Sequence, residues 1–149
     1  SNYLVFCEFI QKEIEKIGIN IIVDVIPPSS LKEAKANGKL DFFRASWVAD
    51  YPDAQNYLSL YHSKNFAPLG PNYTHFSNET YDKLYEESLG ETKQIKKEIL
   101  YKKMDSIIME ESTIVPLFYD EVIRFSHKNI FNLGVNPINI LDLRRVTKN

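Results

Sequence analysis

Apolar positions follow two different periods along the first half of this chain. Residues 3–17 repeat their apolar positions every three to four residues, which predicts an amphipathic helix that ends at Gly18. Residues 19–27 and 40–47 are short apolar runs instead, and both are expected to be strands. Between them the Ser-x-x-Glu pattern of residues 30–33 predicts the capping box of a short helix. Helix, strand, helix and strand in this order predict an α/β layer.

The second half of the chain continues with two helices and further strands. Ser77 or Asn78 is expected to cap a helix that Gly90 closes, and a longer helix is expected over residues 92–111. Residues 113–127 predict two short strands or one bent pair, and 141–146 a last strand. The fold class predicted is α/β, a mixed β-sheet flanked by helices. The expected buried face of the long helix comprises Ile95, Ile99, Met104, Ile107 and Ile108.

Composition indicates one domain, residues 1–149, and narrows the classes of partner. No linker, repeat or low-complexity tract divides the chain. A net charge of −2 gives no basic surface for nucleic acid or for an anionic membrane. The single Cys7 excludes a disulfide within the chain, and no apolar run approaches the roughly 18 residues of a membrane-spanning helix. No signal segment is visible before the first helix, so the chain is expected to be either cytoplasmic or a piece of a longer protein.

Motifs for catalysis and for cofactors are weak. The three histidines, His62, His75 and His127, lack the spacing of metal ligands and are expected to be solvated or locally hydrogen-bonded. There is no nucleophile motif and no phosphate-binding glycine loop. We therefore expect no metal, no cofactor and no enzyme. A hydrolase that uses Asp50 and Asp53 stays open as the alternative from another class, because paired carboxylates can act as acid and base.

The turn Trp47-Val-Ala-Asp-Tyr-Pro-Asp53 offers the best candidate binding chemistry. A carboxylate beside an aromatic wall suits an ammonium group, through a charge-assisted hydrogen bond and a cation–π contact. Trp47 and Asp50 would supply these two parts, and Tyr51 a further wall with a polar tip. The alternative is structural, with Trp47 in the core and Asp50 capping the next turn. Asp53 is expected to cap the helix that follows Pro52.

A family resemblance appears in four segments of the chain. They are FIQKEIEKIGINIIVDVI, GKLDFFRASWVADYPDAQNYLSLYHS, PNYTHFSNETYDKLYEES and, after the long helix, STIVPLFYDEVIRFSHKNI. In this order they resemble the C-terminal part of extracytoplasmic solute-binding proteins of ABC importers, in the family that captures dipeptides, oligopeptides and nickel complexes. The resemblance covers nearly all of residues 3–146, and W-x-A-D-Y-P-D is its most specific match.

The resemblance implies a function without catalysis. The chain would form one lobe of a two-lobed binding protein, periplasmic or lipid-anchored at the cell surface, that delivers peptides to the membrane subunits of an ABC permease. In peptide-binding relatives the aspartate of this turn pairs with the ligand's α-ammonium, which points to Asp50, with Trp47, Tyr51 and Ala49 around it. Relatives with similar scaffolds take nickel chelates, haem or sugars, so a non-peptide solute stays open.

The resemblance also implies an incomplete sheet. The family has another strand directly before the first helix, in the interior of the lobe's sheet, and this chain lacks it. Unpaired backbone at a sheet position invites pairing with another chain. We therefore expect that the chain on its own dimerises or rearranges at this unfilled position of the sheet.

Overall fold

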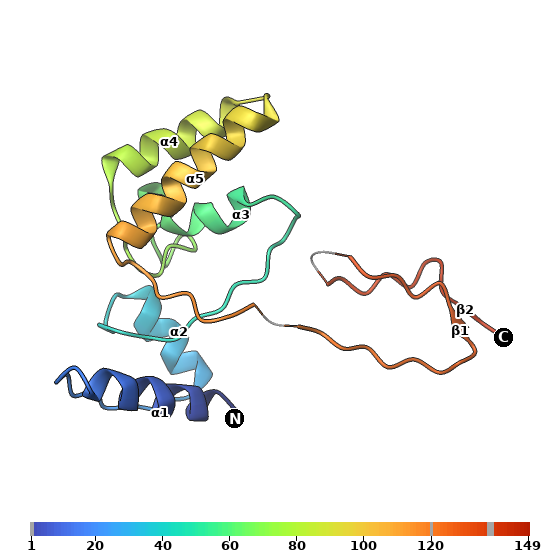
Figure 1. The fold of residues 1–149 in the computed structure, drawn as a ribbon, viewed down its shortest axis with the longest axis horizontal. Coiled ribbons are helices and arrows are strands. Elements are labelled where there is room, and N and C mark those ends of the chain that lie inside the picture. The colour runs from blue at the N-terminus through green and yellow to red at the C-terminus, as the bar shows by residue number, and fades with distance from the viewer. Residues whose placement is uncertain (1, 120, 137–138) are drawn as a thin grey trace.

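The computed structural model describes residues 2–119, 121–136 and 139–149 (Figure 1). Five α-helices and a two-stranded sheet are found in these ranges, and none of the helices is long and apolar enough to cross a membrane. In chain order the elements are α1 (Asn2–Glu15), α2 (Pro28–Ala36), α3 (Gln55–Leu58), the 3₁₀ turns η1 (Ser59–Tyr61) and η2 (Ser63–Asn65), α4 (Glu79–Gly90), α5 (Gln94–Glu110), β1 (Ile130–Phe131) and β2 (Thr147–Lys148).

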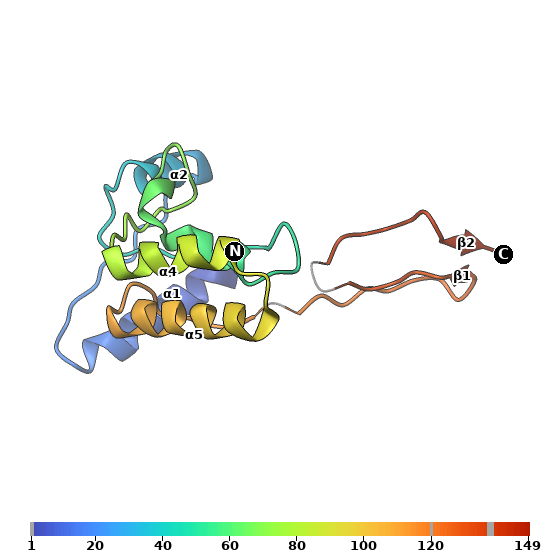
Figure 2. The ribbon, with the colours of Figure 1, turned by 90° about the horizontal axis from the view of Figure 1, so that it is seen from above.

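The core lies where α3 packs against the helical hairpin of α4 and α5. Figures 1 and 2 show α4 and α5 side by side, with α3 across them. The hydroxyl of Tyr81, a fully buried residue, donates a 2.7 Å hydrogen bond to the carbonyl oxygen of Leu58. This bond satisfies the one polar atom that burial of the ring would otherwise leave unpaired. The buried cluster comprises Leu58, Tyr81, Tyr85, Met104 and Ile108.

The helix starts test two predictions about capping. The side chain of Asn78 accepts the backbone N–H groups of Thr80 and Tyr81, so the predicted cap of α4 is confirmed. The capping box at residues 30–33 is wrong, because α2 begins at Pro28 without a side-chain cap. Proline favours the first helical position, since its fixed φ suits a helix and its missing N–H would have no partner there.

The buried face of α5 differs from the predicted one at its N-terminal end. Leu100, Met104 and Ile108 are buried, each four residues from the next, and they follow the seam with α4. Ile95 and Ile99 are 76% and 48% exposed, so the prediction that they are buried is wrong. The sequence has apolar residues on two stripes of this helix, and only the position of α4 selects one of them.

The predicted strands do not form within the described residues. Residues 19–27 and 40–47 have no strand pairing, and neither does the described part of 113–127, within which residue 120 lies outside the description. The last strand lies at β2, after the predicted 141–146, and pairs antiparallel with β1. A strand requires a neighbour to accept and donate its backbone hydrogen bonds. The apolar runs are present, but the described chain brings no partner alongside them.

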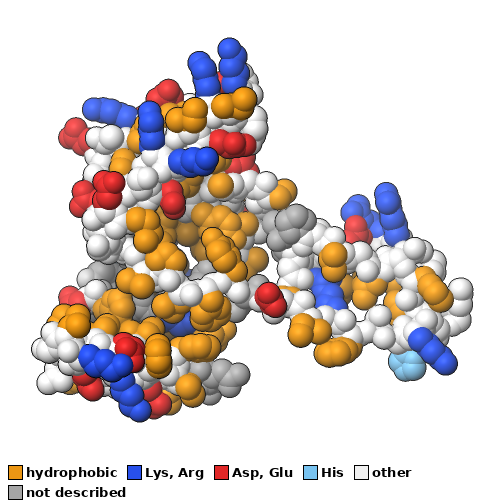
Figure 3. Space-filling model, viewed as in Figure 1, with side chains coloured by type: hydrophobic (Ala, Val, Ile, Leu, Met, Phe, Trp, Pro, Cys, Tyr) orange, Lys and Arg blue, Asp and Glu red, His pale blue; other side chains and the backbone are white. Residues whose placement is uncertain are grey.

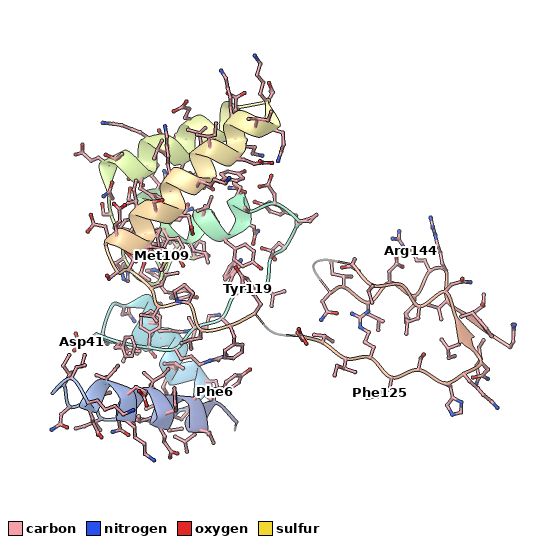
Figure 4. All side chains as sticks on the ribbon, viewed as in Figure 1. Phe6, Asp41, Met109, Tyr119, Phe125 and Arg144 are labelled. Atoms are coloured by element: carbon pink, nitrogen blue, oxygen red, sulfur yellow. The ribbon has the colours of Figure 1, made fainter. Side chains whose placement is uncertain are left out.

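Residues 121–136 and 139–149 form an arm that extends from the helical body (Figure 1). Phe125 and Arg144 lie on this arm, far from Phe6 and Met109 of the helices (Figure 4). The arm is held to itself by β1 and β2 and by a 2.8 Å hydrogen bond from Arg124 to the carbonyl oxygen of Asn139. Figure 3 shows apolar side chains along the arm and on the exposed face of the body. Single large apolar side chains are strongly exposed on both parts, such as Phe125 at 94% on the arm and Ile22 at 91% on the body.

A tight loop connects η2 to α4 and contains a glycine that admits no side chain. The N–H of Gly70 donates to the carbonyl oxygen of Phe66 at 2.9 Å, and the N–H of Asn72 donates to that of Asn65 at 2.7 Å. A Cβ atom on Gly70 would lie 2.4 Å from the Asn65 carbonyl oxygen. Backbone atoms cannot move aside as a flexible side chain would, so this contact requires glycine.

We predict opposite outcomes for two glycine substitutions. Gly70→Ala should lower the free energy of unfolding by about 1–3 kcal/mol, the usual cost of inserting an atom into a packed site. Gly90→Ala is the matched control, because nothing lies within 4 Å of its added Cβ at the end of α4. It should raise stability by roughly 0.5 kcal/mol through helix propensity. Urea unfolding followed by circular dichroism measures both, and equal stabilities would contradict the loop geometry.

Candidate functional site

The turn before α3 carries two aspartates with different surroundings. Asp53 lies against α5: its carboxylate accepts 2.8 Å hydrogen bonds from the Lys97 ammonium and the Tyr101 hydroxyl. It also accepts the N–H of Gln55, the first residue of α3, at 2.9 Å, but the N-cap position itself is Ala54, so the predicted cap at Asp53 is wrong by one residue. Asp53 therefore joins the start of α3 to α5.

These contacts decide the charge of Asp53. Partial burial raises the pKa of its carboxyl, but the hydrogen bonds from Lys97, Gln55 and Tyr101 outweigh burial, and the net pKa lies below the ordinary value. The bond to Asp53 likewise raises the pKa of the Lys97 ammonium. Both partners thus stay charged at neutral pH, and the carboxylate's charge is already balanced by a cation.

Asp50, three residues earlier, is exposed and makes no salt bridge with any residue that the structure describes. Its carboxylate oxygen Oδ2 accepts a long hydrogen bond, 3.4 Å, from the side-chain amide of Asn56. The amide is neutral, so it orients the carboxylate without cancelling its charge. Asp50 is therefore a negative charge at the surface of the turn, available to a cation from outside the chain.

Trp47 is joined to Asp50 through the same asparagine. Its indole Nε1–H donates a 2.7 Å hydrogen bond to Asn56 Oδ1, which also accepts the backbone N–H of Asp50 at 3.3 Å. The Trp47 side chain is not in the core, since the residue is 37% exposed. The Asn56 side chain thus connects the two predicted site residues. Part of the Trp47 ring stays exposed on the same turn as the Asp50 carboxylate.

The other two predicted site residues line the same turn. Tyr51 is 43% exposed, and its hydroxyl donates to the side-chain oxygen of Gln55. The amide of Gln55 donates in turn to the hydroxyl of Tyr85 on α4. Ala49 is half-buried and has only a methyl group to offer. Tyr51 is therefore tethered to the core at its hydroxyl, while part of its ring faces outward.

Two residues with structural roles at this site were not predicted from the sequence. Asn56 and Gln55 are amides in the first turn of α3, and nothing in their spacing distinguishes them from solvated helix residues. Asn56 is only 4% exposed. The available signal was its neighbour Leu58, which lies on the buried side of the same short helix, but two residues are too few to define a helix face.

The prediction of solvated or locally hydrogen-bonded histidines is confirmed for His75, whose Nε2 lies 3.2 Å from the Ala67 carbonyl oxygen. It is wrong for His62, which is buried and whose Nε2 has no hydrogen-bond partner among the described residues. Its ring lies 4.7 Å from that of Tyr85, centroid to centroid, and its Nε2 atom is 3.7 Å from Glu86 Oε1 and 3.9 Å from Asp82 Oδ1. Asp82 accepts the backbone N–H of Ser63 at 3.0 Å, so it serves the local backbone. Among the described residues there is no group of three or more His, Cys, Asp or Glu side chains that could hold a metal ion.

Comparison with known proteins finds a protein family and several relatives that the chain resembles. Residues 3–68 match the model of the bacterial extracellular solute-binding proteins, family 5, middle part. The chain is 28% identical, over 140 residues, to di/tripeptide-binding protein 1 of Pseudomonas aeruginosa (strain UCBPP-PA14), covering 93% of this chain and 26% of that protein. It is 25% identical, over 108 residues, to the probable deoxycholate-binding periplasmic protein YgiS of Escherichia coli (strain K12), covering 72% of this chain and 19% of that protein.

A solved structure shares the fold. The periplasmic murein tripeptide-binding protein MppA, in its unliganded open form, superposes with a TM-score of 0.61 at 24% identity, over 66% of this chain and 18% of that one. This likeness confirms the predicted fold class, one lobe of a periplasmic-binding-protein-like fold. The chain spans about a fifth to a quarter of the length of these relatives. The chain is therefore similar to the bacterial extracellular solute-binding proteins of family 5, by the family model over residues 3–68 and by its relatives over most of its length.

Proposed function

We propose that this chain is a single domain, one lobe of a longer solute-binding protein that captures short peptides outside the cytoplasmic membrane for an ABC importer. The observation that carries the proposal is the exposed carboxylate of Asp50. It shares the hydrogen-bonding partner Asn56 with the aromatic Trp47, and no cation of the described chain pairs with it. The names of two relatives, a di/tripeptide-binding and a murein tripeptide-binding protein, support the solute class.

The chemistry of the turn suits the amino end of a peptide. An α-ammonium can donate charge-assisted hydrogen bonds to Asp50, and these are about twice as strong as neutral ones. Trp47 and Tyr51 can face the ammonium or the first side chain of the peptide, where a cation–π contact contributes about 0.5–1 kcal/mol at a partly exposed site. The half-buried Ala49 leaves room for backbone beside the carboxylate.

Capture in this proposal is a shift of population between open and closed states. A peptide that contacts both lobes has a higher affinity for the closed state, and this difference alone drives closure. Asp50 would supply one anchor from this lobe, and the second lobe would supply the rest. We place the full-length protein in the periplasm or on the cell surface, held there by a lipid anchor, with ABC permease subunits as its partners.

A non-peptide solute is the alternative on the same scaffold, since the probable solute of one relative is deoxycholate. Nickel chelates, haem and sugars belong to the same alternative. Deoxycholate is an anion, and the exposed Asp50 carboxylate would repel it. The charge at this turn therefore favours a cationic group in the ligand.

The surroundings of Asp53 argue against the hydrolase that would use both aspartates. General acid catalysis requires a carboxyl that is protonated near neutral pH, which calls for a raised pKa. The pKa of Asp53 is lowered instead, and its oxygens are occupied by Lys97, Tyr101 and the α3 backbone. Asp53 has the surroundings of a structural residue.

The first prediction concerns the role of Asp50. In the full-length protein, Asp50→Asn should weaken the binding of a short peptide about 10- to 100-fold, the usual contribution of a hydrogen bond to a charged group. N-acetylation of the peptide, which removes the ammonium, should weaken binding to the wild type but not further to the variant. Isothermal titration calorimetry measures all four affinities. An equal affinity of both proteins for the free peptide would refute the assignment.

The second prediction concerns the pH dependence of stability. Because the pKa of Asp53 is lower in the folded chain than in the unfolded chain, its contribution is present above the ordinary value of 3.8 and is lost as pH falls through the folded value. Asp53→Asn should therefore lower Tm at pH 7 by about 2–4 °C. The difference from wild type should shrink as the pH falls below 3.8, toward the lower folded value.

The matched control for this prediction is Asp142→Asn. The hydrogen bonds from Arg144 lower the pKa of Asp142 to about 2, but both residues are exposed and local to the arm. Its substitution should leave Tm unchanged at every pH. Scanning calorimetry across the pH range compares the three proteins, and a pH-independent difference for Asp53→Asn would contradict the ion pair.

The third prediction concerns the edge formed by residues 19–27. We propose that the 149-residue chain dimerises there, since this apolar segment is unpaired and Ile22 and Val25 are 91% and 73% exposed. Light scattering after size exclusion should give twice the monomer mass of 17.3 kDa. Ile22→Lys should give a monomer, whereas Ile95→Lys, at an exposed position of α5, should not. A monomeric wild type would rule the proposal out.

A further inference from the structure

The most buried polar residue of the candidate site is Asn56, and it touches both residues that we assign to the ligand. Its side-chain oxygen accepts the indole N–H of Trp47 at 2.7 Å and the backbone N–H of Asp50 at 3.3 Å. Its amide nitrogen donates to the Asp50 carboxylate at 3.4 Å. One neutral side chain, 4% exposed, thus makes three contacts across a single turn.

The chemistry of the partners determines which atom of the amide faces which group. An indole Nε1–H can only donate, and an ionised carboxylate can only accept. The oxygen of Asn56 must therefore face Trp47, and its nitrogen must face Asp50 Oδ2. Reversing the amide would set donor against donor and acceptor against acceptor. The arrangement is specific to asparagine, because aspartate lacks the donor and leucine lacks both groups.

Asn56 also preserves the charge that the site requires. The other aspartate of the turn, Asp53, is bonded to Lys97 and so is neutralised. A cationic brace would do the same to Asp50 and would compete with a ligand ammonium. A neutral amide holds the carboxylate oxygen Oδ2, and no hydrogen bond to Oδ1 is found among the described residues.

We propose that Asn56 is a positioning residue for the ligand: it sets the Trp47 ring and the Asp50 carboxylate in one fixed relation, before the ligand arrives, without reducing the negative charge. The inference rests on the proposed function, in which Asp50 receives the peptide's ammonium. Its gain comes from preorganisation, because groups already held in place lose less freedom on binding.

The first test uses Trp47, the single tryptophan of the chain. In a ¹⁵N-labelled sample the indole N–H should exchange with solvent at least about tenfold more slowly than in a free tryptophan peptide, since its hydrogen bond to the buried Asn56 protects it. Asn56→Ala should abolish this protection. Asn72→Ala is the matched control: it removes another buried asparagine, bonded to His62 and Phe76 backbone oxygens, and should leave the indole protected.

The second test is a double-mutant cycle in the full-length protein. Asn56→Ala should weaken the binding of a short peptide about tenfold when Asp50 is present, and clearly less in the Asp50→Asn background, where only the position of Trp47 is left to lose. A merely structural role would weaken both backgrounds equally, and this result would overturn the inference. Asn72→Ala should leave the affinity unchanged in both. If Asn56→Ala does not fold, Asn56→Ser keeps a small polar side chain that is too short to span the two partners.

The two tests separate this inference from the proposed function. An unprotected indole in the wild type shows that the hydrogen bond between Trp47 and Asn56 does not exist, and it overturns the inference, whatever the ligand. A protected indole together with an Asp50→Asn variant of unchanged affinity overturns the proposed function, and with it the ligand role of Asn56. Protection lost in Asn56→Ala together with coupling to Asp50 establishes the positioning role.

Discussion

The packing of α3 against the α4–α5 hairpin is the contact on which the rest of the described structure depends. Tyr81 and Met104 are fully buried at this junction, and the Tyr81 hydroxyl also donates a hydrogen bond to the carbonyl oxygen of Leu58. Helix α3 is a single turn, which cannot persist in water by its own hydrogen bonds. It exists because its apolar side enters the hairpin, and the turn that precedes it is held in place as a consequence.

That support explains why two aspartates three residues apart have different surroundings. Asp53 is directed at α5 and meets Lys97, and its charge is used inside the fold. Among the described residues the Asp50 carboxylate accepts a hydrogen bond from the neutral amide of Asn56 alone, so no cation balances its charge there. The division follows from which side of the turn faces the hairpin. A fold that anchors a turn through one carboxylate can expose the other without losing the turn's shape.

A second constraint acts on the apolar runs that do not pair. Residues 19–27 and 40–47 have the composition of inner strands, yet hydrogen bonds between strands require a neighbour at about 5 Å. The described chain offers such a neighbour only at β1 and β2 and at the isolated bridge of Phe66 with Asn72. Helices satisfy their backbone groups internally, so α1, α2, α4 and α5 form where strands do not. This difference accounts for a helical body with exposed apolar segments around it.

What the sequence determined by itself is the local structure and the chemistry of the turn. Helix periodicity and the cap at Asn78 act within a few residues, and so α4 and most of α5 were predicted correctly. The motif from Trp47 to Asp53 likewise named the groups that could bind a cation. These properties depend on neighbours in the chain, which a sequence displays directly.

Tertiary structure alone decided which of those groups work together. It buried Leu100 in place of Ile99, left the predicted strands unpaired, and brought Lys97 to Asp53 across forty-four residues. It also placed Asn56, which the sequence pattern does not distinguish from other helix residues, where its side chain is hydrogen-bonded to both Trp47 and Asp50. The physical reason is that burial and charge pairing depend on distances between segments, and the order of residues does not fix those distances until the helices have packed.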